Sequence, residues 1–285
     1  MTLNTSSSVK VLAASKCEKT GIMLWTLQLR YWRAIHAELM THRVFSRGAG
    51  SSRAIPVKKI LAQVWNDPAG PIHWGVNQSG MQARAELVGW RRALAGSLWR
   101  TAGKVMCGFA WSMMKLGLHK QVTNRLLEPW QYINVIVSST KWDNFFHLRC
   151  HPDAQPEFQE LASRIYFVMS AHRMDGHYRV LKPGEWHLPY ITDDEKKTYP
   201  IDTLVKLSTA RNARVSYAPF DGDSTVEKEI ARHDLLVSSI PRHSGPSEHV
   251  AMCTGLAEEF ANFHGFMQYR KFIEDGVPVD IKEPA

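Results

Sequence analysis

The chain has 285 residues, with 35 lysines and arginines against 27 aspartates and glutamates, and a formal net charge of +8. Its 44% hydrophobic and 22% charged residues exclude wholesale disorder, and the positive charge favours anionic ligands such as nucleotides, folates or nucleic acid. There is no run of five basic residues, so a nucleic-acid-binding tail is not indicated. The four cysteines form no Cys-x-x-Cys pair, which argues against a zinc knuckle and a disulfide framework. Because neither a signal peptide nor a membrane span is evident, we expect a soluble, cytoplasmic protein without a membrane partner.

The first elements are predicted to be two strands joined by a turn. Residues 9–13 and 22–29 are apolar and β-branched, and they flank a Lys-Thr-Gly turn at 19–21. A helix is predicted over 32–42, because apolar residues recur there at helical spacing. This helix would present the segment that follows it from its C-terminal end.

The longest helical pattern covers 81–118, and Gly103 permits a break within it. Trp90, Leu94, Leu98 and Trp99 form an apolar stripe along this pattern. We interpret the stripe as core packing between helices.

The later part of the chain alternates between strand and helix patterns. Strands are predicted at 132–139 and 204–217, and helices at 155–171, 226–238 and 251–273. No repeat or low-complexity linker divides the sequence. We therefore predict one α/β (α+β) domain over 1–285, with an insert at about 65–82 and a loop-rich segment at about 172–203.

The densest cluster of chemically active side chains is the segment 41–53, Thr-His-Arg-Val-Phe-Ser-Arg-Gly-Ala-Gly-Ser-Ser-Arg. Guanidinium groups bind phosphate or an imide edge, and serine hydroxyls with free backbone N–H groups complete an anion cradle. Such a segment favours a small, flat, phosphorylated ligand.

This spacing resembles the signature of the flavin-dependent thymidylate synthases. That signature reads Arg-His-Arg, two residues, Ser, any residue, Asn-Glu, any residue, Ser, any residue, Arg. Five positions of this chain fall on the frame, namely His42, Arg43, Ser46, Ser51 and Arg53. Thr41 replaces the first arginine, and Gly48-Ala49 replace Asn-Glu.

Three other segments resemble motifs of the same family. Arg125 stands where a family arginine contacts the nucleotide, and the Arg149 segment, with Ala154, Gln155 and Glu157, resembles its Asn-Leu-Arg, Ala-Gln-x-Glu element. Residues 213–216 resemble its Ala-Arg-Val-Ser strand, and 243–249 resemble its His-x-x-Pro-x-Glu-His turn. In the usual family order these last two elements precede the arginine-serine motif. Because they follow it here, the resemblance implies a circularly permuted version of the family fold, a central mixed/antiparallel sheet flanked by long helices.

The resemblance implies C5 one-carbon transfer to dUMP, giving dTMP, with FAD as hydride carrier, methylenetetrahydrofolate as donor and NADPH as reductant. Whether the reaction needs NADPH stays open at this point. It also implies a homotetramer. It assigns catalysis to Ser51, Arg53 and Arg149. It assigns substrate binding to Glu38, Ser51, Ser52, Arg53, Arg125 and Arg149. It assigns cofactor binding to His42, Arg43, Asn144, Ser216, His243 and Glu248. No metal is expected, because His147, His151 and Asp153 match no standard ligand spacing.

Two alternatives remain open. The departures at Glu38, Thr41 and Gly48-Ala49 change the predicted nucleotide pocket, so a dUMP hydroxymethylase making 5-hydroxymethyl-dUMP with the same cofactors is the second hypothesis. A non-catalytic nucleotide- or nucleic-acid-binding protein is the third, since the net charge and ten tryptophans permit it. We do not expect a stable nucleic-acid partner for the enzyme.

Overall fold

The computed structural model describes residues 7–215 and 224–276, and its centre is a five-stranded sheet in the order β3-β4-β2-β1-β5. The strands are β1 Ser8–Cys17, β2 Met23–Trp32, β3 Ser46–Ala49, β4 Tyr132–Ser139 and β5 Arg179–Leu181. All neighbours pair antiparallel except β1 and β5, which are parallel. The predicted mixed sheet of an α/β fold is therefore confirmed.

The β1–β2 hairpin confirms the first prediction and supplies the main core. Gly21 turns the chain with a φ of +71°, a conformation that glycine adopts without steric penalty. Alternate side chains of β2 then face one side of the sheet and are at most 1% exposed, namely Trp25, Leu27, Leu29 and Tyr31. They pack against α5 (Asp143–Arg149) and α6 (Pro156–Met174). The helix predicted over 155–171 is α6 and is confirmed, with Pro156 in its first turn.

The helix predicted over 32–42 is shorter than expected. A 3-10 turn, η1 Arg33–Ile35, leads into α1 His36–Leu39, and the chain then leaves the helix. The Thr41 hydroxyl donates to the Glu38 carbonyl at 2.7 Å, a local side-chain bond that competes with helix continuation.

The long helix α3 spans Gly89–Lys115 without a break at Gly103, while 81–88 lie outside it. Its buried side consists of small residues, and at Gly103 an added Cβ would lie 3.0 Å from the Trp130 ring. The predicted core stripe is wrong for three of its four members, because Trp90, Leu94 and Leu98 are 71%, 48% and 61% exposed. Close packing through small residues has turned these large side chains outward.

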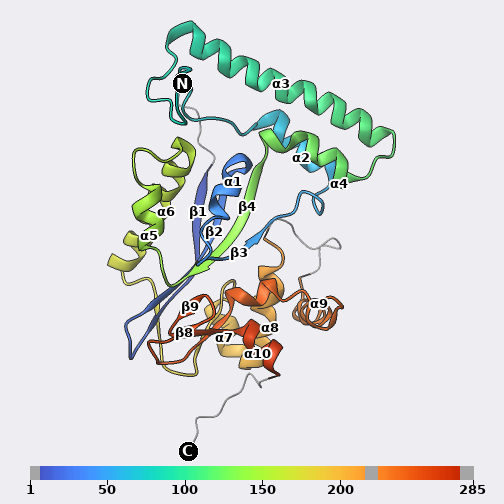
Figure 1. Cartoon of the computed structure of the whole chain (residues 1–285). Helices are drawn as coiled ribbons and strands as arrows, with labels where there is room; N and C mark the ends of the chain where they lie inside the picture. The colour runs from blue at the N-terminus through green and yellow to red at the C-terminus, as the bar shows by residue number, and fades with distance from the viewer. Residues whose placement is uncertain (1–6, 216–223, 277–285) are drawn as a thin grey trace, which may run out of the picture.

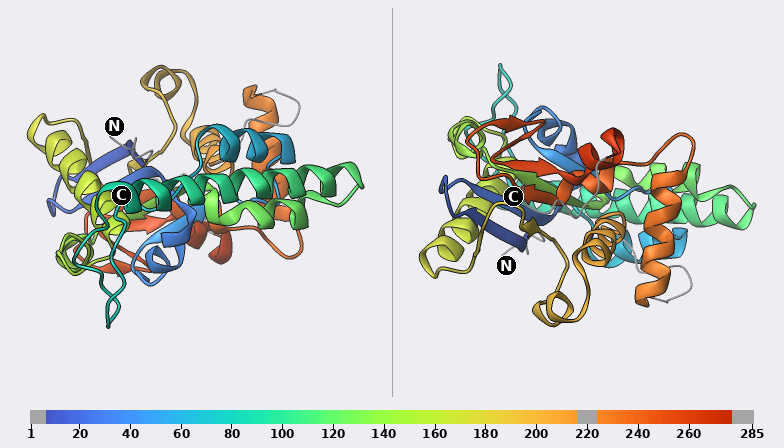
Figure 2. Two further views of the ribbon diagram at one scale, coloured as in Figure 1. Left: turned by 90° about the horizontal axis from the view of Figure 1, so that it is seen from above. Right: turned by 90° about the horizontal axis from the view of Figure 1, so that it is seen from below.

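The remaining helices lie between the strands, except the last, which follows β10 Phe266–Gln268. They are α2 Val57–Asn66, α4 Lys120–Thr123, η2 Asn124–Trp130, α7 Asp193–Thr198, α8 Ile201–Asn212, α9 Val226–Ser238, η3 Gly245–His249 and α10 Tyr269–Asp275. Figure 1 shows α2, α3 and α4 at one end of the molecule and α7 to α10 at the other, with the large sheet between them. In Figure 2, α3 reaches beyond the other elements on one side.

Two predictions in the C-terminal part are wrong. The strand expected at 204–217 is α8 up to Asn212, because Pro200 starts a helix whose apolar residues are buried on more than one side. The helix expected over 251–273 is mostly short strands: β7 Ala251–Cys253, β8 Glu259–Phe260, β9 Phe263–His264 and β10 Phe266–Gln268. Gly255 and Gly265 have φ of +72° and +70° and interrupt any helix there. The helix α9 is confirmed, and 172–203 contains β5, α7 and β6 Trp186–His187.

The strands β10, β7 and β6 form a second, smaller sheet against the polar face of the large one. The four cysteines, all within the described ranges, carry free thiols. No described helix combines the length and apolar character needed to cross a bilayer. Within 7–215 and 224–276, no three histidine, cysteine or acidic side chains gather where they could share a metal ion.

Candidate functional site

Arg149, at the end of α5, is held by side chains of the segment around α1. Its Nε donates to His42 Nε2 at 2.9 Å, Nη1 to Glu38 Oε2 at 2.9 Å and Nη2 to Thr41 Oγ1 at 3.3 Å. The guanidinium carbon also lies 4.6 Å from the centre of the Phe158 ring. The structure thus brings together Arg149, Glu38 and His42, three predicted site residues from two motifs about a hundred residues apart in sequence.

His42 is neutral in this cluster. Burial, together with the charges of Arg149 and Arg47, lowers the pKa of His42 to about 4. Only an unprotonated Nε2 accepts the Arg149 N–H, so the imidazole orients the guanidinium rather than repelling it. His42, predicted to bind the cofactor, is only 7% exposed beside Arg149.

Arg149 and Glu38 line a cavity of about 1160 Å³. Its other walls include His73 of the insert, Arg84 shortly after the insert, Gln155 directly before α6 and Glu157 in its first turn. The volume suits a ligand of nucleotide size or larger. Arg53 and Arg125, the other two predicted dUMP arginines, are not among its wall residues.

Arg53 and Arg125 instead belong to a second cluster, where the loop after β3 packs on η2. Asn124 Nδ2 donates to the carbonyls of Ser52 and Ile55 at 2.7 and 2.9 Å. Both arginine side chains are exposed there. The exposed Ser51 accepts a hydrogen bond from the Arg53 backbone N–H, whereas the buried Ser52 donates to Glu128 Oε1 at 3.1 Å.

A third contact joins the arginine-serine segment 41–53 to the turn at 243–249, because η3 lies against β3. Gln268 Nε2 donates to Ser46 Oγ at 2.7 Å and to the Glu248 carbonyl at 2.9 Å. An added Cβ at Gly48 would lie 3.2 Å from His249 Nε2. The arginine-serine segment and the 243–249 turn are thus neighbours in space, although about two hundred residues separate them in sequence.

A buried chain of hydrogen bonds holds η3 and the small sheet to the large sheet. It runs from Ser15 to His187, Thr26, Ser138 and His249, with successive distances of 2.8, 2.8, 2.6 and 2.9 Å. Burial lowers the pKa of both histidines to about 3, and His249 adds to the effect on His187. Both imidazoles are therefore neutral at ordinary pH, and a neutral imidazole can donate from one ring nitrogen and accept at the other within such a chain.

The remaining predicted residues lie at or near the surface. Arg43, Asn144 and His243 are exposed, and Glu248 accepts from Arg270 Nη1 at 2.5 Å. Ser216 lies outside the described residues.

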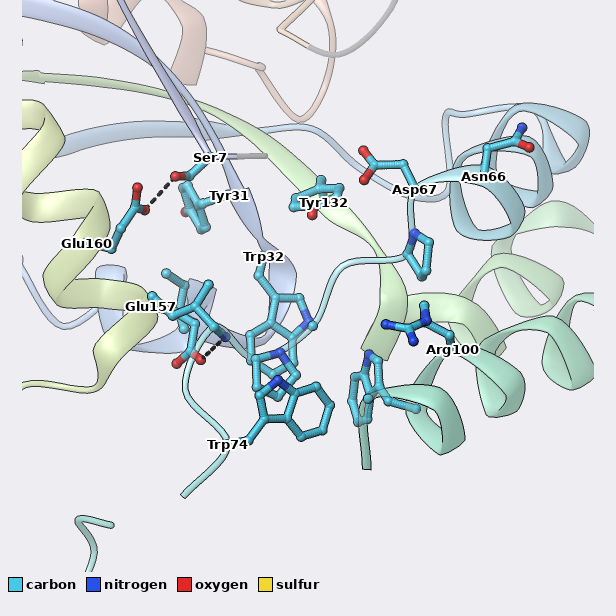
Figure 3. A pocket seen from close by; sticks show the side chains of 17 residues that line it. Ser7, Tyr31, Trp32, Asn66, Asp67, Trp74, Arg100, Tyr132, Glu157 and Glu160 are labelled. Carbon is cyan, nitrogen blue, oxygen red and sulfur yellow. Dashed lines mark hydrogen bonds between the residues drawn. The ribbon is translucent and has the colours of Figure 1, made fainter. Parts of the chain in front are cut away.

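A second, smaller cavity of about 200 Å³ adjoins the first, and Trp32, Pro71 and Glu157 line both. Figure 3 shows its aromatic side chains, including Tyr31, Trp74 and Tyr132, with carboxylates at the α6 side. Neither this cavity nor the part of the insert that walls it was predicted from the sequence as functional. The available signal was a tryptophan within a proline- and glycine-rich loop.

Known proteins offer distant structural likeness and no sequence match. No family model matches the sequence, and no curated protein matches it. The structure is similar to the UMP/dUMP methylase PolB from Streptomyces cacaoi bound with 5-Br dUMP, at a TM-score of 0.48 and 12% identity over 62% of this chain and 98% of that chain. It is also similar to the flavin-dependent thymidylate synthase ThyX from Helicobacter pylori complexed with FAD and dUMP. Here the TM-score is 0.36 and the sequence identity 14%, over 53% of this chain and 70% of that chain. These are partial superpositions, so a function for this chain must be argued from its own residues.

Proposed function

We propose that this chain binds dUMP and transfers a one-carbon unit to C5 of its uracil ring, with a flavin and a folate as cofactors. The observation that carries the proposal is the Arg149 cluster, in which Glu38, Thr41 and His42 hold one guanidinium at the wall of a cavity of about 1160 Å³. The contact of η3 with β3 supports a circularly permuted family fold, because it joins motifs that occur in reverse sequence order.

Arg149 retains binding capacity in this arrangement. A guanidinium has five N–H donors, and three of those of Arg149 have partners, which leaves two for a ligand. Two N–H groups suit a phosphate or the carbonyl and imide edge of uracil. A fixed cation at the ring edge stabilises negative charge that develops when C5 acts as a nucleophile. Arg53, Arg125, Ser51 and Ser52 stay proposed dUMP contacts, although within this chain they lie in the second cluster and do not line the cavity of Arg149.

The chemistry of the exposed side chains fits a flavin in part. Arg43 offers a guanidinium for a diphosphate, and Asn144 and His243 offer polar groups for the ring edge or ribose. His42 does not fit that role, since its Nε2 is bonded to Arg149. FAD would supply hydride transfer and methylenetetrahydrofolate the carbon, with NADPH as reductant, and the chain's residues bind and orient.

The hydroxymethylase is the second candidate, and the Glu38–Arg149 ion pair favours it. A carboxylate beside the guanidinium offsets part of its charge and can hold a water molecule at the wall of the site. Water rather than hydride would then capture the exocyclic methylene, giving 5-hydroxymethyl-dUMP.

Anaerobic incubation with dUMP, FAD and methylenetetrahydrofolate, with and without NADPH, tests both candidates by mass spectrometry of the nucleotide. Methyl and hydroxymethyl products differ by one oxygen. Arg149→Ala should abolish product and weaken dUMP binding, whereas Arg91→Ala, on the exposed face of α3, should do neither. A colourless protein that takes up no FAD and makes no product would reject both. Salt-sensitive oligonucleotide binding in that protein would favour the non-catalytic hypothesis.

We also propose that copies of this chain associate. The number of copies, four, is the one that the resemblance to the flavin-dependent thymidylate synthases implies. The support is the exposed apolar stripe of α3, which includes Leu98, Val105 and Phe109. Multi-angle light scattering of the purified protein measures the number of copies directly.

A further inference from the structure

A further cavity, of about 530 Å³, lies at the hairpin end of the large sheet, between β1, β2, α5 and α6. We call it the hairpin cavity. Figure 1 shows the two helices beside β1. The volume falls within the roughly 300–1,000 Å³ of small-molecule sites. No residue of its wall lines the Arg149 cavity or the smaller cavity of Figure 3, so the hairpin cavity is a separate site.

The buried part of this wall is apolar. Trp25, Trp142 and Met169 line the cavity and are 1%, 5% and 6% exposed. The Trp142 indole N–H donates to the Ser139 carbonyl at 3.0 Å, so this ring needs no hydrogen-bond partner from a ligand. An apolar group that enters the cavity would leave water for this surface, which favours its binding.

A row of aromatic rings extends the wall from the core to the solvent. Phe146, one turn after Trp142, stacks on it with ring centres 5.9 Å apart. Tyr166 of α6 meets Phe146 edge to face at 5.2 Å and is itself 56% exposed. Because these rings already contact one another, they lose little freedom when a further ring packs on them.

The polar part of the wall carries both signs of charge. Arg173 lies on the cavity side of α6, because Tyr166, Met169 and Arg173 follow one another at i, i+3 and i+7. Asp143 is the first residue of α5. Lys16, in β1, adds a second cation.

These charges are unpaired within the part of the chain that the structure describes. There, Asp143, Arg173 and Lys16 form no ion pair, either with one another or with other side chains. Lys16 Nζ instead lies 5.9 Å from the centre of the Tyr178 ring. Opposite charges that face one cavity without pairing suit a ligand that carries both signs itself.

We propose that the hairpin cavity binds a free aromatic amino acid. The carboxylate of such a ligand suits the guanidinium fork of Arg173, and its ammonium group suits Asp143. Its ring would pack against Phe146 and Tyr166. The inference goes beyond the proposed function and does not depend on it, because this ligand is neither the nucleotide nor a cofactor of that reaction.

The test measures binding of L-phenylalanine to the full chain by calorimetry, with three reference ligands that each lack one feature. They are 3-phenylpropionate, which lacks the ammonium group, 2-phenylethylamine, which lacks the carboxylate, and L-leucine, which lacks the ring. Each should bind about 10-fold more weakly than L-phenylalanine, since each loses one charged hydrogen bond or the ring contact.

Two variants assign the charges separately. Arg173→Gln should weaken L-phenylalanine binding about 10-fold and leave 2-phenylethylamine binding unchanged. Asp143→Asn should weaken L-phenylalanine binding to a similar extent and leave 3-phenylpropionate binding unchanged. Arg164→Gln, on the same helix, and Asp175→Asn, at its C-terminal end, lie outside the cavity wall and are the matched controls.

Thermal midpoints of all variants show whether each remains folded. The inference is overturned if L-phenylalanine does not bind the unmodified protein, if any reference ligand binds equally well, or if either folded charge variant retains full affinity. A loss of affinity for L-phenylalanine together with the matching analogue would also overturn it, because the charge would then not act on the group assigned to it.

Discussion

Acid should destabilise this protein through its two fully buried histidines, His187 and His249. Their pKa is about 3 in the folded chain against 6.5 in an unfolded one, so the unfolded state binds more protons at intermediate pH. The stability that they contribute is present above pH 6.5 and is lost as the pH falls toward 3. At pH 5 each histidine should lower the free energy of unfolding by about 2 kcal/mol relative to pH 7, or about 4 kcal/mol for the pair.

The measurement is urea unfolding at pH 7, 6 and 5 at one protein concentration. The double variant His187→Gln, His249→Asn keeps hydrogen-bonding amides in the buried chain but cannot titrate. Its absolute stability will differ, so the quantity compared is the change in the free energy of unfolding between pH 7 and 5. That change should be about 4 kcal/mol smaller than in the unmodified protein, whereas His147→Gln, an exposed control, should leave it unaltered. If the double variant loses as much stability in acid as the unmodified protein, the two imidazoles are not the groups responsible.

Two further predictions concern α3 and the Arg149 cluster. Gly103→Ala should lower the free energy of unfolding by about 1–3 kcal/mol, because the added methyl group would lie 3.0 Å from the Trp130 ring. Gly108→Ala should raise the free energy of unfolding by about 0.5–1 kcal/mol, because no atom lies within 4 Å of the added methyl group and alanine favours the helix. Thermal unfolding separates them, and effects of the same sign would contradict the packing argument. Glu38→Gln should tighten dUMP binding by about 3- to 10-fold, since it removes the carboxylate that neutralises Arg149. Unchanged affinity in a calorimetric titration would show that Arg149 does not contact the nucleotide.

The elements predicted correctly are those whose signals are local. The β1–β2 hairpin follows from a turn glycine between apolar runs, and α6 from Pro156 at its first position. The incorrect predictions, α8 and the short strands after Ala251, occur where tertiary packing decides. Apolar residues of α8 are buried on more than one side, so they lack the one-sided periodicity of a surface helix. Single glycines at 255 and 265 look tolerable in a helix until their positive φ is known.

The candidate site shows a similar division. The sequence indicated Glu38, His42 and Arg149 separately, through a resemblance, and their mutual hydrogen bonds arise only when α5 is placed beside α1. No pattern indicated that His42 would orient Arg149, because the pKa of an imidazole depends on burial. The same holds for His187 and His249, whose hydroxyl partners lie on three different strands.

The insert shows why the cavities in particular could not be predicted. A loop has no periodicity from which to infer the direction of a side chain, so Trp74 was indistinguishable from a surface tryptophan. Its position depends on Glu157, a residue 83 positions later, which accepts the Ile72 N–H at the start of α6. This carboxylate thus fixes a loop and also lines both cavities. The burial of this carboxylate is offset by the Ile72 N–H and the Gln155 amide, which donate to its two oxygens at 2.9 and 3.1 Å. Its role in the fold thus depends on two neighbours far apart in sequence, which a sequence pattern cannot place together.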